Sequence, residues 1–422
     1  MSQERYGAMN LLFVHQGFPG QYIHILRALA SHKTHQIVAL GMEHKSNGLP
    51  EGIQYFKYGA SRSNQPGLHP WVQDIETKVI RAEACADAAL NLKKQGFFPD
   101  LICGHPGWGE LLFLKDIWPE TPILGYQEFF YNPKGFDYNF DPEMQDQPDW
   151  KGCARIRMKT ANQLLNLEIC DWNISPTQFQ RESYPQKWRE KISVIHDGID
   201  TNKACPNLKP ANIQLGDGTI LKPGEKIVTF VNRSLEPYRG YHTMIRAIPE
   251  LQCLAPDAKL IIVGQTTGVS YGAACPDGEW KDYFLNEIKG NYDPSRVVFT
   301  GNIPYKQFIP LLQLSQAHVY LTYPFVLSWS LLEAMSCGCA VVGSNTAPVQ
   351  EVIDNGRNGL LVDFFNPKQL AGKITELLNN RSLAKELGEE ARKTVLRRFE
   401  LNSCVQRQLG LMDLVANHCL RS

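Results

Sequence analysis

The stretch from residue 317 to residue 362 constrains the fold most, because it reads as two buried strands joined by a short helix. Its first apolar run is rich in β-branched and aromatic residues and ends at a Tyr-Pro pair, which is typical of a buried strand. A polar-aromatic turn, residues 327–330, opens a short helix that ends at Gly338, and a second apolar run follows at 340–343. A strand, a helix and a strand in this order predict a parallel sheet.

Glu333 lies just inside this helix. We expect its carboxylate to sit beside free backbone N–H groups at the carboxyl end of a strand, an arrangement that suits a phosphate next to a sugar hydroxyl. A helix-capping role for Glu333 is the alternative, because Ser330 stands three residues before it.

Length and composition limit the classes of protein that this chain can belong to. With 422 residues it is long enough for two or three domains. Its 43 basic and 43 acidic residues balance, so we expect no nucleic-acid partner. No apolar stretch approaches the ~20 residues that span a bilayer, and the polar N-terminus predicts no signal peptide. The eleven scattered cysteines predict reduced thiols in a cytoplasmic protein and no zinc site.

The N-terminal half starts with a βαβ pattern, formed by an apolar run at 10–14, a helical segment at 21–29 and an apolar run at 36–40. The turn after the first strand carries Gly17, Phe18 and Gly20 in a pattern that is not GxGxxG. A loop that binds an acceptor or a phosphate and an ordinary tight turn are both open here.

His105 and Glu128 follow two later predicted strands, 100–103 and 122–125. A histidine at a strand's carboxyl end is a candidate for function, although a structural hydrogen bond explains it equally well. Glu128 stands among aromatic residues that would partly desolvate it, so it is either a proton-handling group or a paired structural acid. A loop without clear periodicity then runs to Trp150.

Further predicted elements complete this half. They are helices at 71–95 and 153–170, strands at 171–175 and 192–195, and a domain boundary within 201–226. Lys93 and Lys94, followed by two phenylalanines, allow a peripheral membrane contact, with a solvated helix end as the simpler interpretation.

The second half repeats the pattern of apolar strands and helices, with strands at 227–231, 259–264 and 297–301 preceding the opening stretch. These strands predict a second parallel sheet. Arg233 and Arg239 flank its first strand-to-helix turn, where two guanidinium groups can clamp a diphosphate. Surface salt bridges are the alternative role for them.

At this point the chain resembles the retaining glycosyltransferases of family 4, which have the GT-B fold. The matching motifs are Asn232-Arg233, Arg239-Gly240, Asp197-Gly-Ile-Asp200, Leu331-Leu-Glu-Ala-Met335, Gly338, Ala340-Val-Val342, Glu351-Val-Ile353 and Asn358-Gly-Leu-Leu-Val362. The chain is also similar to a subgroup that opens with His-Gln-x-Phe-Pro-Gly-Gln and carries Pro-Phe-Val-Leu-Ser-Trp-Ser.

The resemblance implies an α/β architecture of two Rossmann-like parallel-sheet domains that face a central cleft. Residues 1–200 would form the N-terminal, acceptor-binding domain, and residues 201–400 would bind the nucleotide sugar. Residues 401–422 would form a helix, predicted from Leu401 to Cys419, that crosses back to the first domain.

The resemblance also implies roles for individual residues. Arg233 would stabilise the diphosphate leaving group, Arg239 would take the place of a family lysine, and Glu333 would bind the donor ribose. Phe325 stands where the family has a first acid that contacts the donor sugar, and either Glu128 or His105 would act for the family's N-domain histidine. The remaining donor-binding residues would be Ser328, Trp329, Ser330, Leu331 and Gly264.

The expected function is therefore transfer of a hexose from a nucleotide diphosphate sugar, UDP-sugar before GDP-sugar, to an acceptor hydroxyl with retention. The resemblance implies no cofactor and no metal. The acceptor is open between a glycan, a lipid-linked sugar and a small molecule. A non-catalytic nucleotide-sugar-binding protein and a nucleotide-sugar epimerase are the alternatives, the first because Phe325 replaces an acid.

Overall fold

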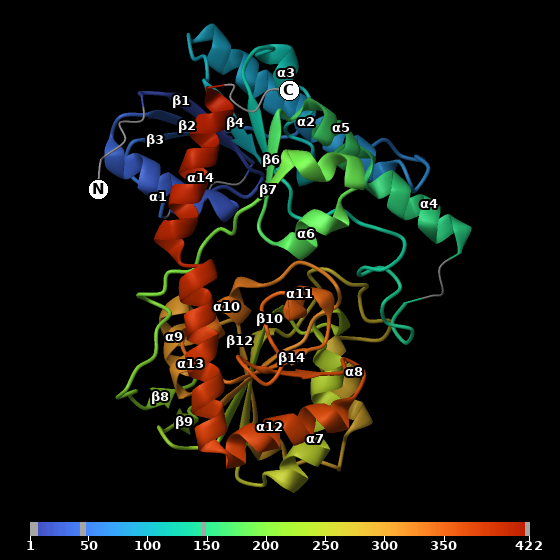
Figure 1. Ribbon diagram of the computed structural model, residues 1–422. Helices are drawn as coiled ribbons and strands as arrows, with labels where there is room; N and C mark the ends of the chain where they lie inside the picture. The colour runs from blue at the N-terminus through green and yellow to red at the C-terminus, as the bar shows by residue number, and fades with distance from the viewer. Residues whose placement is uncertain (1–6, 43–47, 146–148, 418–422) are drawn as a thin grey trace. The chain divides into compact units, whose positions relative to one another are not determined.

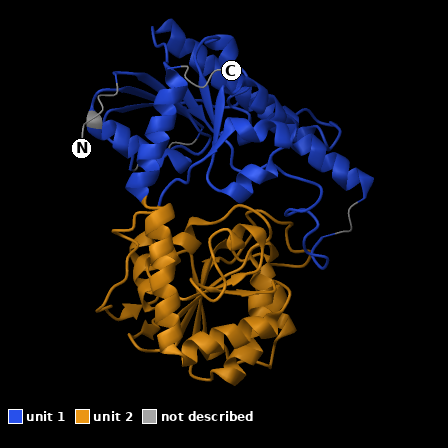
Figure 2. Cartoon of the chain, in the orientation of Figure 1, with its two compact units in different colours: residues 1–198, 401–422 blue, residues 199–400 orange. Residues whose placement is uncertain are grey.

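The computed structural model describes residues 7–42, 48–145 and 149–417. The chain divides into two compact units, coloured separately in Figure 2. Unit 1 contains residues 1–198 and 401–422, and unit 2 contains residues 199–400.

Unit 1 is built on a parallel sheet of seven strands in the order β3-β2-β1-β4-β5-β6-β7 (Figure 1). The strands are β1 (Asn10–Val14), β2 (Gln36–Gly41), β3 (Ile53–Lys57), β4 (Leu101–Gly104), β5 (Ile123–Tyr126), β6 (Trp172–Ser175) and β7 (Ile192–Val194). The order reverses between β1 and β4, which pair directly with Leu11 opposite Leu101. Ligands of doubly wound sheets bind at the carboxyl ends of the strands around such a reversal.

The helices of unit 1 cover both faces of this sheet. They are α1 (Ile23–His32), α2 (Gln73–Lys94), α3 (Leu114–Ile117), α4 (Trp150–Lys159), α5 (Ala161–Ile169), α6 (Gln178–Ser183) and α14 (Leu401–Ala416). Side chains alternate along β1, so Leu11 and Phe13 pack with α1 and α14, whereas Leu12 and Val14 pack with α2 and α3. Nowhere in the described ranges, in either unit, is a helix long and apolar enough to cross a bilayer.

Two expectations for unit 1 need correction, and a third is not tested. Strand β3 was not predicted, so the strand expected at 100–103 is the fourth along the chain. The helix expected at 153–170 is two helices, α4 and α5, which meet at Thr160. The C-terminal helix was expected to reach Cys419, a residue outside the described ranges.

Unit 2 contains a second parallel sheet, with six strands in the order β12-β11-β10-β13-β14-β15. The strands are β10 (Ile227–Ser234), β11 (Lys259–Gln265), β12 (Val297–Gly301), β13 (Ala317–Tyr320), β14 (Val341–Ser344) and β15 (Leu360–Val362), beside a short hairpin of β8 (Ile213–Gln214) and β9 (Ile220–Leu221). The prediction of two parallel sheets is confirmed, and the strand order of unit 2 reverses between β10 and β13.

The helices of unit 2 include the short helix expected around Glu333. They are α7 (Tyr241–Leu254), α8 (Trp280–Glu287), α9 (Tyr305–Leu314), α10 (Trp329–Ser336), α11 (Ala347–Gln350), α12 (Pro367–Asn379) and α13 (Arg381–Arg398). Strand β13 is shorter than expected, because it ends at Tyr320 while the chain stays buried to Phe325. Helix α10 follows and ends before Gly338, whose φ of +79° suits a glycine after a helix.

Candidate functional site

Unit 2 has an open pocket of about 350 Å³ at the carboxyl ends of β10 and β11. The start of α9, the residues just before it and the start of α10 complete its wall. The lining residues are Val231, Asn232, Arg233, Val263, Asn302, Ile303, Tyr305, Phe308, Ser328 and Ser330. The fold therefore brings three of the predicted donor-site residues, Arg233, Ser328 and Ser330, to one cavity.

Arg233 is the cation of this pocket. It lies near the end of β10 and is exposed, and its guanidinium makes no hydrogen bond or ion pair with any residue in the described part of the chain. An exposed arginine without a carboxylate partner keeps its donors available for an anion.

The start of α10 is arranged differently from the expectation. Ser328 is the N-cap, and its hydroxyl accepts a hydrogen bond from the backbone N–H of Ser330 at 3.3 Å. Ser330 and Glu333 therefore form no capping box, and the capping alternative for Glu333 is wrong. The backbone N–H of Ser328 donates to the Tyr320 hydroxyl at 2.8 Å, and that of Leu331 donates to the Ser328 carbonyl at 3.3 Å. The backbone donors expected to be free at these three positions already have partners.

Glu333 lies near a tyrosine that the sequence analysis did not single out. Tyr305 lines the pocket, and its hydroxyl is near enough to the Glu333 carboxyl group to influence the pKa of that group. Burial raises the pKa of Glu333 to about 7, and the Tyr305 hydroxyl acts in the opposite direction. The carboxyl group is thus divided between its neutral and charged forms at neutral pH.

Arg239 has a different environment from Arg233. It is buried, and its Nη1 donates to Thr322 Oγ1 at 2.8 Å and to the Val326 carbonyl at 3.0 Å. The guanidinium carbon lies 5.0 Å from the Tyr271 ring centre and 5.6 Å from the Phe325 ring centre, which is cation–π geometry. Phe325 thus packs against a buried cation, and neither residue is part of the pocket lining.

Two further features hold the insertion after β11 and the ends of β10 and β11 in place. Glu236 is fully buried and accepts backbone hydrogen bonds from Ser270, Tyr271 and Gly272, which anchors the insertion after β11. Gly264 has a φ of +151°, and a side chain there would press on the Asn232 carbonyl. Gly264 therefore allows the ends of β10 and β11 to approach each other beneath the pocket.

Unit 1 has its own polar cluster at the carboxyl ends of β1, β4 and β5. His15 Nε2 lies 2.8 Å from Gln21 Oε1, and Gln21 Nε2 donates to Glu128 Oε1 at 3.5 Å. His105 Nε2 lies 3.6 Å from Glu128 Oε2. The fold therefore brings both candidates for the histidine role, His105 and Glu128, together.

A hydrogen bond to Nδ1 fixes the tautomer of His105. Its Nδ1 accepts the backbone N–H of Gly107 at 3.0 Å, so Nε2 carries the proton that points at Glu128. The Trp108 ring stacks on His105 with centroids 4.1 Å apart. Burial opposes the charge on Glu128, but the hydrogen bond and charge of His105 hold the pKa of Glu128 below its ordinary value. Burial, together with the charge of His105, lowers the pKa of His15 to about 3, so His15 stays neutral.

The glycine-bearing turn at residues 17–20 packs against this cluster. Gly20 has a φ of +52°, and a side chain there would collide with the His15 ring. Phe18 is buried, and Gly17 is half-buried beside it. The turn thus has a packing reason for Gly20, and a ligand contact at Gly17 or Phe18 stays a prediction.

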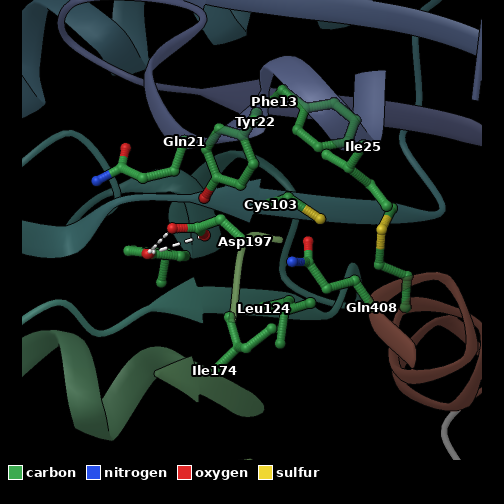
Figure 3. Close-up of a pocket in the computed structure, with 11 residues that line it drawn as sticks. Phe13, Gln21, Tyr22, Ile25, Cys103, Leu124, Ile174, Asp197 and Gln408 are labelled. Atoms are coloured by element: carbon green, nitrogen blue, oxygen red, sulfur yellow. Dashed lines mark hydrogen bonds between the residues drawn. The ribbon is translucent and has the colours of Figure 1, made fainter. Parts of the chain in front are cut away.

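A small cavity lies next to the cluster (Figure 3). Tyr126 donates to both carboxylate oxygens of Asp197 at 3.0 Å, and the side chains of Tyr22 and Gln408 also line this cavity. About 20 Å³ is accessible to the centre of a water molecule, enough for one ordered water.

No group of three or more His, Cys, Asp or Glu side chains within residues 7–42, 48–145 and 149–417 is arranged to hold a metal ion. The expectation that the reaction needs no metal stays a prediction.

Two family models match successive parts of the chain. Residues 33–204 match the glycosyl transferase family 4 group, and residues 217–394 match glycosyl transferases group 1. An uncharacterized glycosyltransferase of Methanocaldococcus jannaschii is 28% identical over 189 residues, which cover 44% of this chain and 45% of that protein. The chain matches only about half the length of such curated relatives.

Solved structures resemble the chain over nearly its whole length. Sucrose-phosphate synthase of Thermosynechococcus elongatus is 18% identical, with a TM-score of 0.70 and coverage of 96% of this chain and 98% of that one. HepE of Anabaena, solved in complex with UDP-glucose, is 18% identical, with a TM-score of 0.63 and coverage of 96% and 99%. These structures share the fold, whereas the two family matches together span well over half of the sequence. The chain therefore has the GT-B fold, and its N-terminal and C-terminal parts each match a glycosyl transferase family model.

Proposed function

We propose that this protein is a cytoplasmic, retaining glycosyltransferase that transfers a hexose from a UDP-sugar to an acceptor hydroxyl. The pocket of unit 2 carries the proposal, because Arg233 shares it with Ser328 and Ser330 at the start of α10, the helix that carries Glu333. Arg233 offers a cation to a diphosphate, and Glu333 offers a carboxylate to a sugar diol. UDP is favoured over GDP because HepE, a protein of the same fold, was solved with UDP-glucose.

The proposed step balances without a further reactant. The bond between the anomeric carbon and the donor phosphate oxygen breaks, and the acceptor oxygen bonds to the same face of that carbon. The acceptor proton moves to the departing phosphate oxygen, and a nucleoside diphosphate leaves. Arg233 would stabilise the negative charge that develops on the leaving group. The family 4 match supports retention.

For the acceptor we propose the polar cluster of unit 1. Glu128 keeps a lowered pKa and is an acceptor of hydrogen bonds, and His105 Nε2 is a donor that points at it. A sugar hydroxyl can both donate and accept, so this pair suits an acceptor hydroxyl. The neighbouring Trp108 offers an aromatic face for the sugar ring.

Donor binding and product release test this function. UDP-, GDP- and ADP-sugars are screened by thermal shift, and release of nucleoside diphosphate is measured with and without acceptor extracts. We expect the UDP-sugar to bind the parent, and Arg233→Ala to weaken binding and lower kcat by about 100-fold, as for other lost charge-stabilising donors. The anomeric configuration of the product, read by NMR, tests retention.

Arg357→Ala is the matched control, because Arg357 is an exposed arginine of unit 2 paired with Asp354, outside the pocket lining. It should bind the donor as the parent does. If Arg233→Ala and Glu333→Ala both bind the donor as tightly as the parent, the site is assigned wrongly. Donor binding without release of nucleoside diphosphate would favour the non-catalytic binding protein, and interconversion of the sugar without transfer would favour the epimerase.

A further inference from the structure

Arg239 is a buried cation that is bonded to the stretch of chain leading into α10. It is the last residue of a short 3-10 helix, Pro237–Arg239, and is 5% exposed. Its Nη1 donates to Thr322 Oγ1 at 2.8 Å, to the Val326 carbonyl at 3.0 Å and to the Tyr320 hydroxyl at 3.4 Å. A guanidinium removed from water needs such hydrogen bonds, because an unpaired buried charge is costly. The cation therefore joins three points of one short stretch of chain.

The loop before α10, residues 321–327, links Tyr320 at the end of β13 to Ser328, the N-cap of α10. Its residues are buried, except for the half-buried Val326. The backbone N–H of Ser328 donates at 2.8 Å to the Tyr320 hydroxyl, the same oxygen that accepts from Arg239. A hydroxyl oxygen has two lone pairs, so it can accept both bonds. One oxygen atom thus connects Arg239 to Ser328, which lines the pocket.

A glycine and two aromatic rings allow Arg239 to pack against this loop. Gly240 has a φ of +68°, and a side chain there would press on the Leu321 side chain. The absence of a side chain therefore lets the 3-10 helix approach the loop closely. The rings of Tyr271 and Phe325 lie against the guanidinium, in the cation–π geometry described above. Arg239 is shielded by these rings and does not line the pocket.

We propose that Arg239 is a positioning residue for the donor, which acts through the loop before α10 and does not touch the diphosphate. The inference rests on the proposed function and gives the two arginines different roles. Arg233 is exposed in the pocket and would meet the diphosphate directly. Arg239 instead holds the Val326 carbonyl and the Tyr320 hydroxyl. These two bonds keep Ser328 and the start of α10 in the geometry in which the donor binds.

The experiment measures the Kd for UDP by calorimetry, in the full chain. Arg239→Met removes the donors and keeps an unbranched side chain, and Tyr320→Phe removes the hydroxyl and keeps the ring. We expect each variant to bind UDP about fivefold to tenfold more weakly, as for the loss of one hydrogen bond. The double variant should bind UDP about as weakly as the weaker single variant, because both substitutions break the same connection.

The salt dependence of the Kd separates positioning from direct contact. Salt screens an exposed charge strongly and a buried charge much less. Arg233→Ala should therefore flatten the salt dependence of UDP binding, because it removes an exposed cation from the diphosphate. Arg239→Met should keep the salt dependence of the parent while it weakens binding.

Two matched controls lie in the same unit, outside the pocket lining. Tyr241→Phe removes a hydroxyl that donates to the Lys281 carbonyl at 3.2 Å from a buried ring. Arg246→Met removes a guanidinium that pairs with Glu287 and lies 5.4 Å from the Phe284 ring centre. Both controls should bind UDP as the parent does.

The inference is overturned if Arg239→Met and Tyr320→Phe bind UDP as the controls do while Arg233→Ala binds it more weakly, because the two residues then serve stability alone. It is also overturned if Arg239→Met flattens the salt dependence as Arg233→Ala does, because Arg239 then contacts the diphosphate. A parent that binds no nucleotide would instead refute the proposed function, and the inference with it. Should Arg239→Met not fold, Tyr320→Phe must still weaken UDP binding for the inference to stand.

Discussion

At the scale of single residues, burial makes the charge of Glu333 costly. Its pKa of about 7 is higher than the ordinary value for a glutamate, so the folded protein holds a proton that the unfolded chain releases between about pH 4.5 and 7. Stability is therefore lost as pH rises through this window, and the loss is complete above it. A residue that weakens the fold at neutral pH is expected at a binding site.

We predict that Glu333→Gln stabilises the ligand-free protein at pH 8 while it weakens donor binding. The amide has no charge to bury. The gain should be on the order of 1–2 kcal/mol, discounted because the group is partly exposed, and it should vanish near pH 4.5. Urea unfolding of variant and parent at pH 4.5 and pH 8 measures the difference, and an equal difference at both pH values would contradict it.

The sequence identified some site residues because they follow strands in a readable pattern. Arg233, Ser328 and Ser330 come after apolar runs at the carboxyl ends of two strands and meet in one pocket. Tyr305 was missed, since 28 positions separate it from Glu333 and only the tertiary fold brings the two residues near each other. Its one signal was a turn after β12 in the sequence Gly-Asn-Ile-Pro.

Arg239 shows a different limit of sequence reading. Its position near Arg233 suggested that both guanidinium groups bind one ligand. The burial of Arg239, however, depends on the insertion after β11, which Glu236 anchors. That insertion brings Tyr271 over the guanidinium. No local pattern around Arg239 encodes this contact.

At the scale of elements, the buried strands could be predicted from the sequence. The exposed strand β3 and the break between α4 and α5 could not. Strand β3 lies at the sheet edge and alternates half-buried with exposed residues, so it lacks an apolar run. The junction of α4 and α5 at Thr160 contains neither proline nor glycine. The prediction that α14 belongs to unit 1 came from the family resemblance, because a helical sequence pattern does not indicate which sheet the helix covers.

We predict that α14 contributes to the core of unit 1 through its buried face. Leu409 is 7% exposed and packs in the core with β1, β4 and α1, whereas Leu414 on the same helix is 44% exposed. Leu409→Ala should lower the free energy of unfolding of unit 1 by about 2–5 kcal/mol. Leu414→Ala should change it by less than about 0.5 kcal/mol. Urea unfolding compares the two, and equal effects would show that the buried face of α14 adds nothing.

At the scale of the whole molecule, each unit has its own sheet and its own core. A nucleotide without a sugar should therefore act on one unit. We predict that UDP slows amide hydrogen exchange at residues 302–305 and 328–333 of unit 2 and leaves residues 105–110 of unit 1 unchanged. Exchange measured by mass spectrometry with and without UDP checks this, with Arg233→Ala as the control that should show no protection. Protection confined to unit 1 would show that UDP binds unit 1 and would contradict the prediction.

The division of unit 1 into two chain segments also sets an order of events during synthesis. The ribosome makes residues 199–400 before it makes α14, so the core of unit 1 lacks Val405, Leu409 and Met412 while unit 2 is being synthesised. Apolar side chains of β1 and α1 that α14 later covers stay exposed until then. Unit 1, although its synthesis begins first, therefore completes its core only when α14 docks, after unit 2 has been made.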